Sequence, residues 1–166
     1  MHTVNPRPII EALHLAAPLK TLGDFPPEAS YATVAFCINS EEMPSMEAAL
    51  DVFKDVPAKL IEVPVETVIK ALMLFSEVSE EFGSFEKYHA WYLTNSHVPN
   101  HSPNNRWPCI ASDDKYEFIL DGWHRMHSYI RNGHKTIPIL QYDYPEWWKA
   151  HAIWKTQYLQ TRLVNA

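Results

Sequence analysis

A strand, a glycine turn, a helix and a second strand follow one another in the C-terminal half, and this run constrains the fold more than any other feature. Residues 116–120 are rich in aromatic and aliphatic side chains, which predicts a strand ending at Asp121-Gly122. Trp123–Arg131 has helical periodicity and is followed by Asn132-Gly133, a typical helix stop. Residues 136–141 predict the next strand. Elements joined by such short turns pack against one another, so the sequence predicts a domain that contains both helices and strands.

Further predicted elements extend this pattern toward both ends of the chain. Strands are predicted at residues 31–38, 60–63 and 108–111, and helices at residues 9–15, 46–54, 66–78, 85–93 and from about Pro145 onward. We expect one compact unit of three parts. Residues 1–57 are an N-terminal extension that packs on the core, residues 58–142 are the core, and residues 143–166 are an amphipathic C-terminal helix.

Composition and charge limit the kinds of partner that this protein can have. The chain has 166 residues and a formal net charge of −6, and no run of Lys or Arg appears. Because nucleic-acid binding depends on neutralising phosphates, this balance disfavours a nucleic-acid partner. The start of the chain has no apolar run typical of a signal peptide, and no stretch approaches the roughly 20 apolar residues of a membrane span. With Cys37 and Cys109 outside any CxxC spacing, we expect a cytoplasmic protein without a membrane partner.

The C-terminal run also carries a motif. Pro108-Cys109-Ile110 precedes the strand that ends in Asp121-Gly122-Trp123-His124-Arg125, and Gly133 and Ile137-Pro138-Ile139 follow. In this order the residues resemble the ParB/sulfiredoxin superfamily, in an Asp-Gly-x-His-Arg variant of the ParB-like N-terminal or nuclease domain. The resemblance covers about residues 58–142 and implies an α+β fold of the ParB/sulfiredoxin type, in which a mixed sheet packs against helices.

The resemblance implies a site more directly than a reaction. Members of the superfamily include partition CTPases, ATP-dependent peroxiredoxin-repair enzymes, free-serine kinases, and plasmid or phage proteins. They share a nucleotide or phosphate at the start of the helix after the glycine. The implied function is Mg²⁺-assisted phosphoryl transfer or NTP hydrolysis with ATP, ADP or CTP, acting on a small hydroxyl-bearing acceptor or a protein partner. Trp123 stands where sulfiredoxin has its cysteine, so sulfinic acid reduction is not expected.

Two other functions stay open at this point. The first is a non-catalytic regulatory or protein-interaction module of plasmid or phage origin, which has kept the fold. The second is a ParB-like nuclease or DNA-binding protein, which the acidic net charge and the lack of a recognisable helix-turn-helix disfavour.

The residue types of the loop suit phosphate chemistry. A helix N-terminus offers free backbone N–H groups and a partial positive charge, and Gly122 permits close approach of a ligand. Arg125 can bind phosphate oxygens in a bidentate manner, and His124 can donate to a phosphate oxygen or move a proton. Asp121 can act as a general base or hold Mg²⁺ through water. The purely structural alternative is that Asp121 caps the helix, Gly122 permits the turn and Arg125 forms a surface ion pair.

Residues outside the loop complete the predicted site. Trp123 is assigned to the nucleotide-binding set with the rest of the loop, and Arg106 can reach the same phosphates. Glu62 and Glu66 flank Pro64, where the resemblance places nucleotide-proximal groups, and Glu62 is the candidate second catalytic carboxylate. For Arg106, Glu62 and Glu66, the ordinary alternative is a charged side chain on the surface with no role in a site.

Histidines and aromatic residues offer weaker signals. His124 and His127, with His97 and His101, match no zinc signature, so no metal ligands are assigned. On the helix after Gly122, the spacing places Met126, Tyr129 and Ile130 in the core. It places His124, Ser128 and Arg131 on an exposed face with His127 nearby. The C-terminal helix carries four large aromatic residues, Trp147, Trp148, Trp154 and Tyr158. We expect them to pack against the domain, and a platform that stacks on nucleic-acid bases is the alternative.

Overall fold

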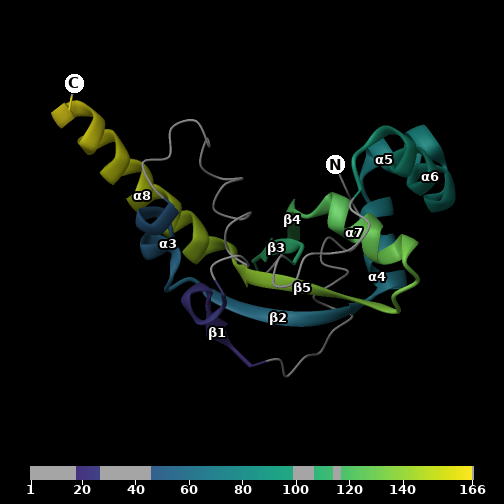
Figure 1. The fold of residues 1–166 in the computed structure, drawn as a ribbon, viewed down its shortest axis with the longest axis horizontal. Helices are drawn as coiled ribbons and strands as arrows, with labels where there is room; N and C mark the ends of the chain where they lie inside the picture. Colours follow the sequence, from purple (N-terminus) through teal and green to yellow (C-terminus); the bar gives the residue numbers. More distant parts are fainter. Residues whose placement is uncertain (1–17, 27–45, 99–106, 114–116, 166) are drawn as a thin grey trace.

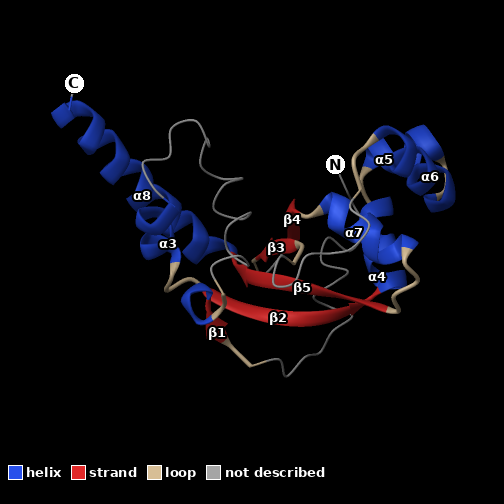
Figure 2. Cartoon of the chain, in the orientation of Figure 1, coloured by secondary structure: helices blue, strands red, loops and turns tan. Residues whose placement is uncertain are grey.

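A computed structural model describes residues 18–26, 46–98, 107–113 and 117–165. Its centre is a five-stranded sheet with the strand order β1-β2-β5-β3-β4 (Figure 2). The strands are β1 Lys20–Thr21, β2 Pro57–Pro64, β3 Cys109–Ser112, β4 Glu117–Asp121 and β5 Thr136–Asp143. Only β3 and β5 run parallel to each other, and the other neighbouring pairs are antiparallel. The predicted α+β class with a mixed sheet is therefore confirmed.

The helices gather in two groups. The described helices are the short 3-10 turn η1 Leu22–Asp24, α3 Met46–Phe53, α4 Val65–Met73, α5 Ser76–Phe82, α6 Phe85–Asn95, α7 Trp123–Arg131 and α8 Tyr144–Asn165. Figure 1 shows α3 and α8 together toward one end of the long strands and α4 to α7 toward the other. None of the helices in the described segments is both long enough and apolar enough to cross a lipid bilayer.

The sheet is buried on both faces. The alternation of side chains along β5 shows which buried cluster lies on which face. In β5, Ile137 and Ile139 belong to one buried cluster, whereas Leu140 and Tyr142 belong to another. Successive side chains of a strand point to opposite faces, so each cluster lies on its own face of the sheet. The nearly continuous apolar character of β5 follows from this double burial.

The first cluster joins the sheet to α3 and α8. Phe53 of α3 packs at a ring-centroid distance of 6.0 Å from Trp147 of α8, and both side chains are buried. The rest of this cluster comes from the strands, from η1, from the turn before β2 and from α8: Leu22, Val56, Ala58, Cys109, Ala111, Leu140, Tyr142 and Ala150. The burial of Trp147 confirms the packing predicted for that residue, whereas Trp148 is exposed and the side chains of Trp154 and Tyr158 lie outside what the structure describes.

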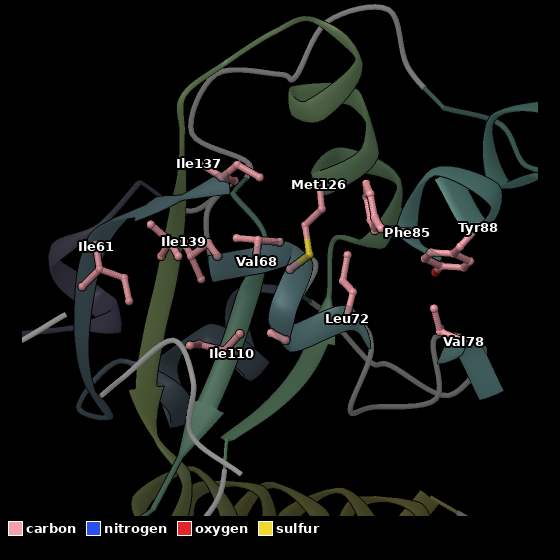
Figure 3. Packing of buried hydrophobic residues seen from close by; sticks show 12 residues of the cluster. Ile61, Val68, Leu72, Val78, Phe85, Tyr88, Ile110, Met126, Ile137 and Ile139 are labelled. Carbon is pink, nitrogen blue, oxygen red and sulfur yellow. The ribbon is translucent and has the colours of Figure 1, made fainter. Parts of the chain in front are cut away.

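The second cluster joins the opposite face to helices α4 to α7. Figure 3 shows side chains from the sheet meeting Val68 and Leu72 of α4 and Met126 of α7. Burial of this many aliphatic and aromatic side chains, each contributing about 1.5–3 kcal/mol, fixes α7 on the sheet. Met126 is fully buried, and Tyr129 and Ile130 pack against the cluster, as the helical spacing predicts.

The prediction of one helix over residues 66–78 is wrong, because the structure has two helices there, α4 and α5. The break comes after α4, where Phe75 is extended (φ −73°, ψ 123°) and α5 begins at Ser76. The Phe75 ring meets Trp123 edge-on at a centroid distance of 5.3 Å. This contact with α7 is remote in sequence, and such packing overrides a local helical preference.

Residues before position 58 contribute to both the sheet and its covering helices. β1 pairs antiparallel with the start of β2, and the backbone N–H of Leu22 donates to Val56. α3 packs against α8 through the first cluster. The predicted helix at residues 9–15 and strand at residues 31–38 lie outside the described residues, as does Cys37.

Candidate functional site

The turn between β4 and α7 forms around Gly122. Its backbone is left-handed (φ 100°, ψ 17°), a conformation that glycine adopts at low cost. A Cβ on this residue would lie 2.5 Å from the Cα atom of Pro108. The glycine is therefore required by its own backbone and by the neighbouring segment that leads into β3. Ligand approach is not needed to explain it.

Trp123 begins α7 and turns its ring toward the core. The ring is half-buried and packs on Phe75 in the second cluster. Much of the ring is therefore committed to holding α7 against the break between α4 and α5. Whether its exposed part contacts a nucleotide stays a prediction.

Arg125 is anchored to the backbone of the segment before β3. It is half-buried, and its guanidinium donates to the carbonyl oxygen of Trp107 at 3.3 Å. This bond holds the first turn of α7 next to residues 107 and 108. A guanidinium carries five N–H donors, so the bond is compatible with a phosphate contact as well.

Among the loop side chains that the structure describes, that of His124 is exposed. Its Nδ1 atom lies 3.3 Å from the hydroxyl oxygen of Tyr92 on α6. With Nδ1 directed at Tyr92, Nε2 is the ring nitrogen that can meet a ligand. No acidic residue occupies the first turn of α7, so no carboxylate there competes for an anion.

A histidine pair, in which His127 is buried and His89 half-buried, lies one turn further along the same two helices. The Nδ1 atoms of His89 on α6 and His127 on α7 are 2.7 Å apart, and the ring planes differ by 11°. His127 is fully buried, and its Nε2 atom has no hydrogen-bond partner among the described residues. Burial lowers the pKa of His127 to about 3, with the nearby His89 and His124 adding to the shift.

Aromatic rings enclose this pair. The Tyr92 ring stacks on His127 with a centroid distance of 3.9 Å and an interplanar angle of 11°. Phe85 stacks on His89, and the Tyr88 ring meets His127 edge-on. Burial raises the pKa of Tyr88 to about 12, so its phenol stays neutral at any physiological pH. The exposed face predicted for α7 is confirmed at His124 and Arg131, which are exposed, but it is wrong at Ser128 and the neighbouring His127, because both side chains are fully buried.

Glu62 is not brought to the loop. Strands β5 and β3 lie between β2 and β4, a lateral separation of about 14 Å at ordinary strand spacing. The neighbours of Glu62 in β2, Ile61 and Val63, belong to the second cluster with α7, so alternation places Glu62 on the opposite face. There its carboxylate accepts a hydrogen bond from the Thr136 hydroxyl at 3.0 Å. The expected convergence of Glu62 with the loop is therefore not observed.

Other predicted site residues have different placements. Asp121 is the last residue of β4 and pairs with Cys109, and its side chain lies outside what the structure describes. Arg106 lies outside the described residues altogether. Glu66 is exposed in the first turn of α4.

Sequence reasoning missed the partners that α6 supplies. His89 and Tyr92 are three residues apart on a predicted helix, and His124 and His127 repeat that spacing on another. Residues three apart lie on one helix face, so each helix presents two polar rings together. The matched spacing was the available signal. Only the packing of α6 on α7 shows that the two faces meet.

Across the described segments, no group of three or more His, Cys, Asp or Glu side chains is arranged to hold a metal ion. No protein-family model, curated protein or solved structure matches this chain.

Proposed function

We propose that this chain binds a nucleotide or another phosphate ester at the N-terminal end of α7, with His124 as a contacting residue. The observation that carries the proposal is that His124 is exposed in the first turn of α7 while Tyr92 orients its ring. Backbone N–H groups of the same turn and the helix dipole favour an anion there. The resemblance of the Asp121–Arg125 motif to the ParB/sulfiredoxin superfamily supports the same ligand class.

The proposed chemistry is phosphoryl transfer or NTP hydrolysis. Nε2 of His124 donates to a phosphate oxygen, or passes a proton to the leaving group as a general acid. Asp121 is the proposed general base toward a water or a substrate hydroxyl. Mg²⁺ would be held by this carboxylate through water and by the phosphates, where it neutralises negative charge. Glu62 has no part in the proposed reaction.

Arg125 has a supporting role in this proposal. Its bond to the Trp107 carbonyl fixes the first turn of α7 relative to Pro108, which packs against Gly122. A rigid turn keeps backbone N–H groups directed at one point, and preorganised donors bind an anion more strongly than mobile ones. Any direct contact between Arg125 and a phosphate would add to this effect.

The test is a thermal-shift panel of ATP, ADP, CTP and GTP with and without Mg²⁺. A ligand present at 100 times its dissociation constant stabilises the fold by about 2.7 kcal/mol, which gives a clear rise in Tm. We expect one or more nucleotides to raise the Tm of the wild type and to have a smaller effect on His124→Gln. His134→Gln is the matched control, because His134 is also exposed but lies beyond the C-terminal end of α7. An equal shift in wild type and His124→Gln would exclude His124 as a ligand contact.

A second candidate is a non-catalytic protein-interaction module. It is favoured by the structural roles of Gly122 and Arg125, which explain two residues of the motif without any ligand. Trp91 on α6 and Trp148 on α8 are both 46% exposed, and large exposed aromatic residues are common at protein interfaces. If no nucleotide shifts the Tm of the wild type, this candidate replaces the first.

A further inference from the structure

Two cross-helix contacts connect α6 to the proposed ligand site, and they share Tyr92 as an intermediate. The Tyr92 hydroxyl contacts His124 in the first turn of α7, and the Tyr92 ring lies flat on the fully buried His127. His127 in turn is hydrogen-bonded to His89, three residues before Tyr92 on α6. The His89–His127 pair therefore fixes the same stretch of α6 that orients His124.

The hydrogen bond in this pair depends on protonation. Each Nδ1 atom can donate or accept, and a bond between two of them needs a hydrogen on one only. The 5.0 Å separation of the ring centroids and the 2.7 Å separation of the Nδ1 atoms place both nitrogens between the two rings, as such a bond requires. When both rings are protonated, both Nδ1 atoms carry hydrogen and the bond cannot form.

We propose that α6 controls the proposed ligand site through a proton-sensitive latch: Tyr92 is the positioning residue for His124, and the His89–His127 hydrogen bond holds Tyr92 in place. At neutral pH the bond is intact and His124 is oriented. As the pH falls, α6 separates from α7, Tyr92 leaves His124, and ligand affinity drops. Only this last consequence rests on the proposed function.

The electrostatic surroundings of the latch favour its opening in acid. On α7, His124 and Arg131 add positive charge near the pair, and Arg131 together with burial lowers the pKa of His89. The titratable groups of α6 in contact with the pair are the phenols of Tyr88 and Tyr92. Burial raises the pKa of both phenols, so they carry no charge between pH 5 and pH 7.5. The remaining charged side chains of α5 and α6 are exposed to solvent: Glu77, Glu80, Glu81, Glu86 and Lys87.

The size of the effect follows from proton linkage. In the opened state each ring regains an ordinary histidine pKa near 6.5, whereas the pKa of closed His127 is about 3. Opening therefore takes up protons below about pH 6.5. Proton uptake by His127 alone multiplies the opening equilibrium by about 30 between pH 7.5 and pH 5, and His89, whose pKa burial also lowers, adds to this effect.

The latch is tested without any ligand by hydrogen exchange of α6 amides in the full chain between pH 5 and pH 7.5. After correction for the intrinsic pH dependence of exchange, we expect α6 opening in the wild type to increase about 30-fold or more toward pH 5. In His127→Phe, which keeps a ring beneath Tyr92 but cannot titrate there, we expect this dependence to fall to the smaller contribution of His89. In His89→Phe we expect the contribution of His127, about 30-fold, to remain. His134→Phe, at an exposed histidine, should behave as the wild type.

Two outcomes of the exchange experiment would overturn the latch. One is α6 opening that does not change with pH in the wild type. The other is an unchanged pH dependence in both His127→Phe and His89→Phe. Because two independent variants report on the same bond, failure of one to fold leaves the other to decide.

The positioning role of Tyr92 is tested by long-range ¹H–¹⁵N spectra of the histidine rings. Tyr92→Phe keeps the ring on His127 and removes only the hydroxyl, so the Nδ1 signal of His124 should move while the His134 signals stay. An unmoved His124 signal would overturn the positioning role. Neither result depends on a ligand.

Titration of the same samples with inorganic phosphate and Mg·ATP then links the latch to the site. We expect Tyr92→Phe to weaken binding about tenfold at pH 7.5, because one hydrogen bond that orients His124 is lost. If the wild type binds and Tyr92→Phe binds equally well, the positioning role is overturned. If the wild type binds neither probe, the proposed function fails, and the exchange and ring spectra still decide on the latch.

Discussion

Gly122 and Pro108 are packed so closely that a single added methyl group at Gly122 would lie 2.5 Å from the Cα atom of Pro108. The contact joins the turn before α7 to the segment that enters β3. Arg125 reinforces it by bonding to the carbonyl of Trp107. The start of α7, where the proposed ligand site lies, is therefore fixed by backbone packing before any ligand is considered.

Replacing Gly122 with alanine should destabilise the protein by about 3 kcal/mol. About 1 kcal/mol comes from the left-handed backbone, and the remainder from forcing apart the two segments. Gly133→Ala is the matched control, since Gly133 is also left-handed (φ 77°) but no atom lies within 4 Å of its added Cβ. Urea denaturation should show the larger loss at Gly122. Equal losses at both glycines would mean that Pro108 can move aside.

Arg125→Ala should lower the free energy of unfolding by about 1.5–3 kcal/mol, because the Trp107 carbonyl loses a charged donor. If Arg125 also contacts the phosphate, nucleotide binding by the folded variant should weaken by a similar free energy. Chemical denaturation and calorimetric titration separate the two effects. Lys135→Ala removes an exposed cation outside the loop and should change neither quantity appreciably. Unchanged stability of Arg125→Ala would show that its backbone contact is dispensable.

Asp121→Asn should abolish turnover while leaving nucleotide binding within a few-fold of the wild type, because an amide cannot act as a general base. Turnover is measured as phosphate release or transfer from the nucleotide identified in the thermal-shift panel. A variant that only melts earlier, with full activity, would show that Asp121 serves the turn and has no chemical role.

Glu62→Gln should leave binding and turnover within about twofold of the wild type and should cost less than about 1 kcal/mol of stability. The side chain lies on the face of the sheet opposite α7 and bonds to Thr136, and an amide oxygen can still accept that bond. A tenfold or larger loss of turnover would contradict the placement of Glu62 away from the site.

His127 should make global stability fall in acid. Its pKa is about 3 in the folded protein and near 6.5 in the unfolded chain, so the unfolded chain binds the proton more tightly. Stability is therefore fully present above about pH 6.5 and is lost as the pH falls toward 3. Between pH 7.5 and pH 5 the loss attributable to His127 is about 2 kcal/mol. Urea denaturation at both pH values should show this difference in the wild type but not in His127→Phe.

Elements with strong local signals were predictable from the sequence. The bounds of α7 match the prediction because Gly122 and Gly133, both left-handed, delimit the helix on its two sides. The strand predicted at residues 136–141 is confirmed as part of β5, and the helix at residues 85–93 as part of α6, whose N-cap is Ser84. Turn residues and periodicity act over a few positions, so a local reading suffices for them.

The candidate site was only partly predictable. His124 could be singled out because its place after a strand and a glycine carries information within one short segment. Its partners could not, because Tyr92 lies on a helix that is separate in sequence. The burial of His127 was likewise hidden, since helical spacing alone cannot say whether a second helix covers a polar face.

In the segments with clear turn residues and periodicity, the sequence by itself determined where strands and helices begin and end. It also determined that the chain is of the α+β class. Tertiary structure decided that Phe75 interrupts a helix, that Glu62 lies on the far face from α7, and that His89 meets His127. Each of these depends on contacts between residues far apart in the chain. Local backbone preferences are weak compared with the burial of side chains between packed elements, so such contacts prevail wherever the two conflict.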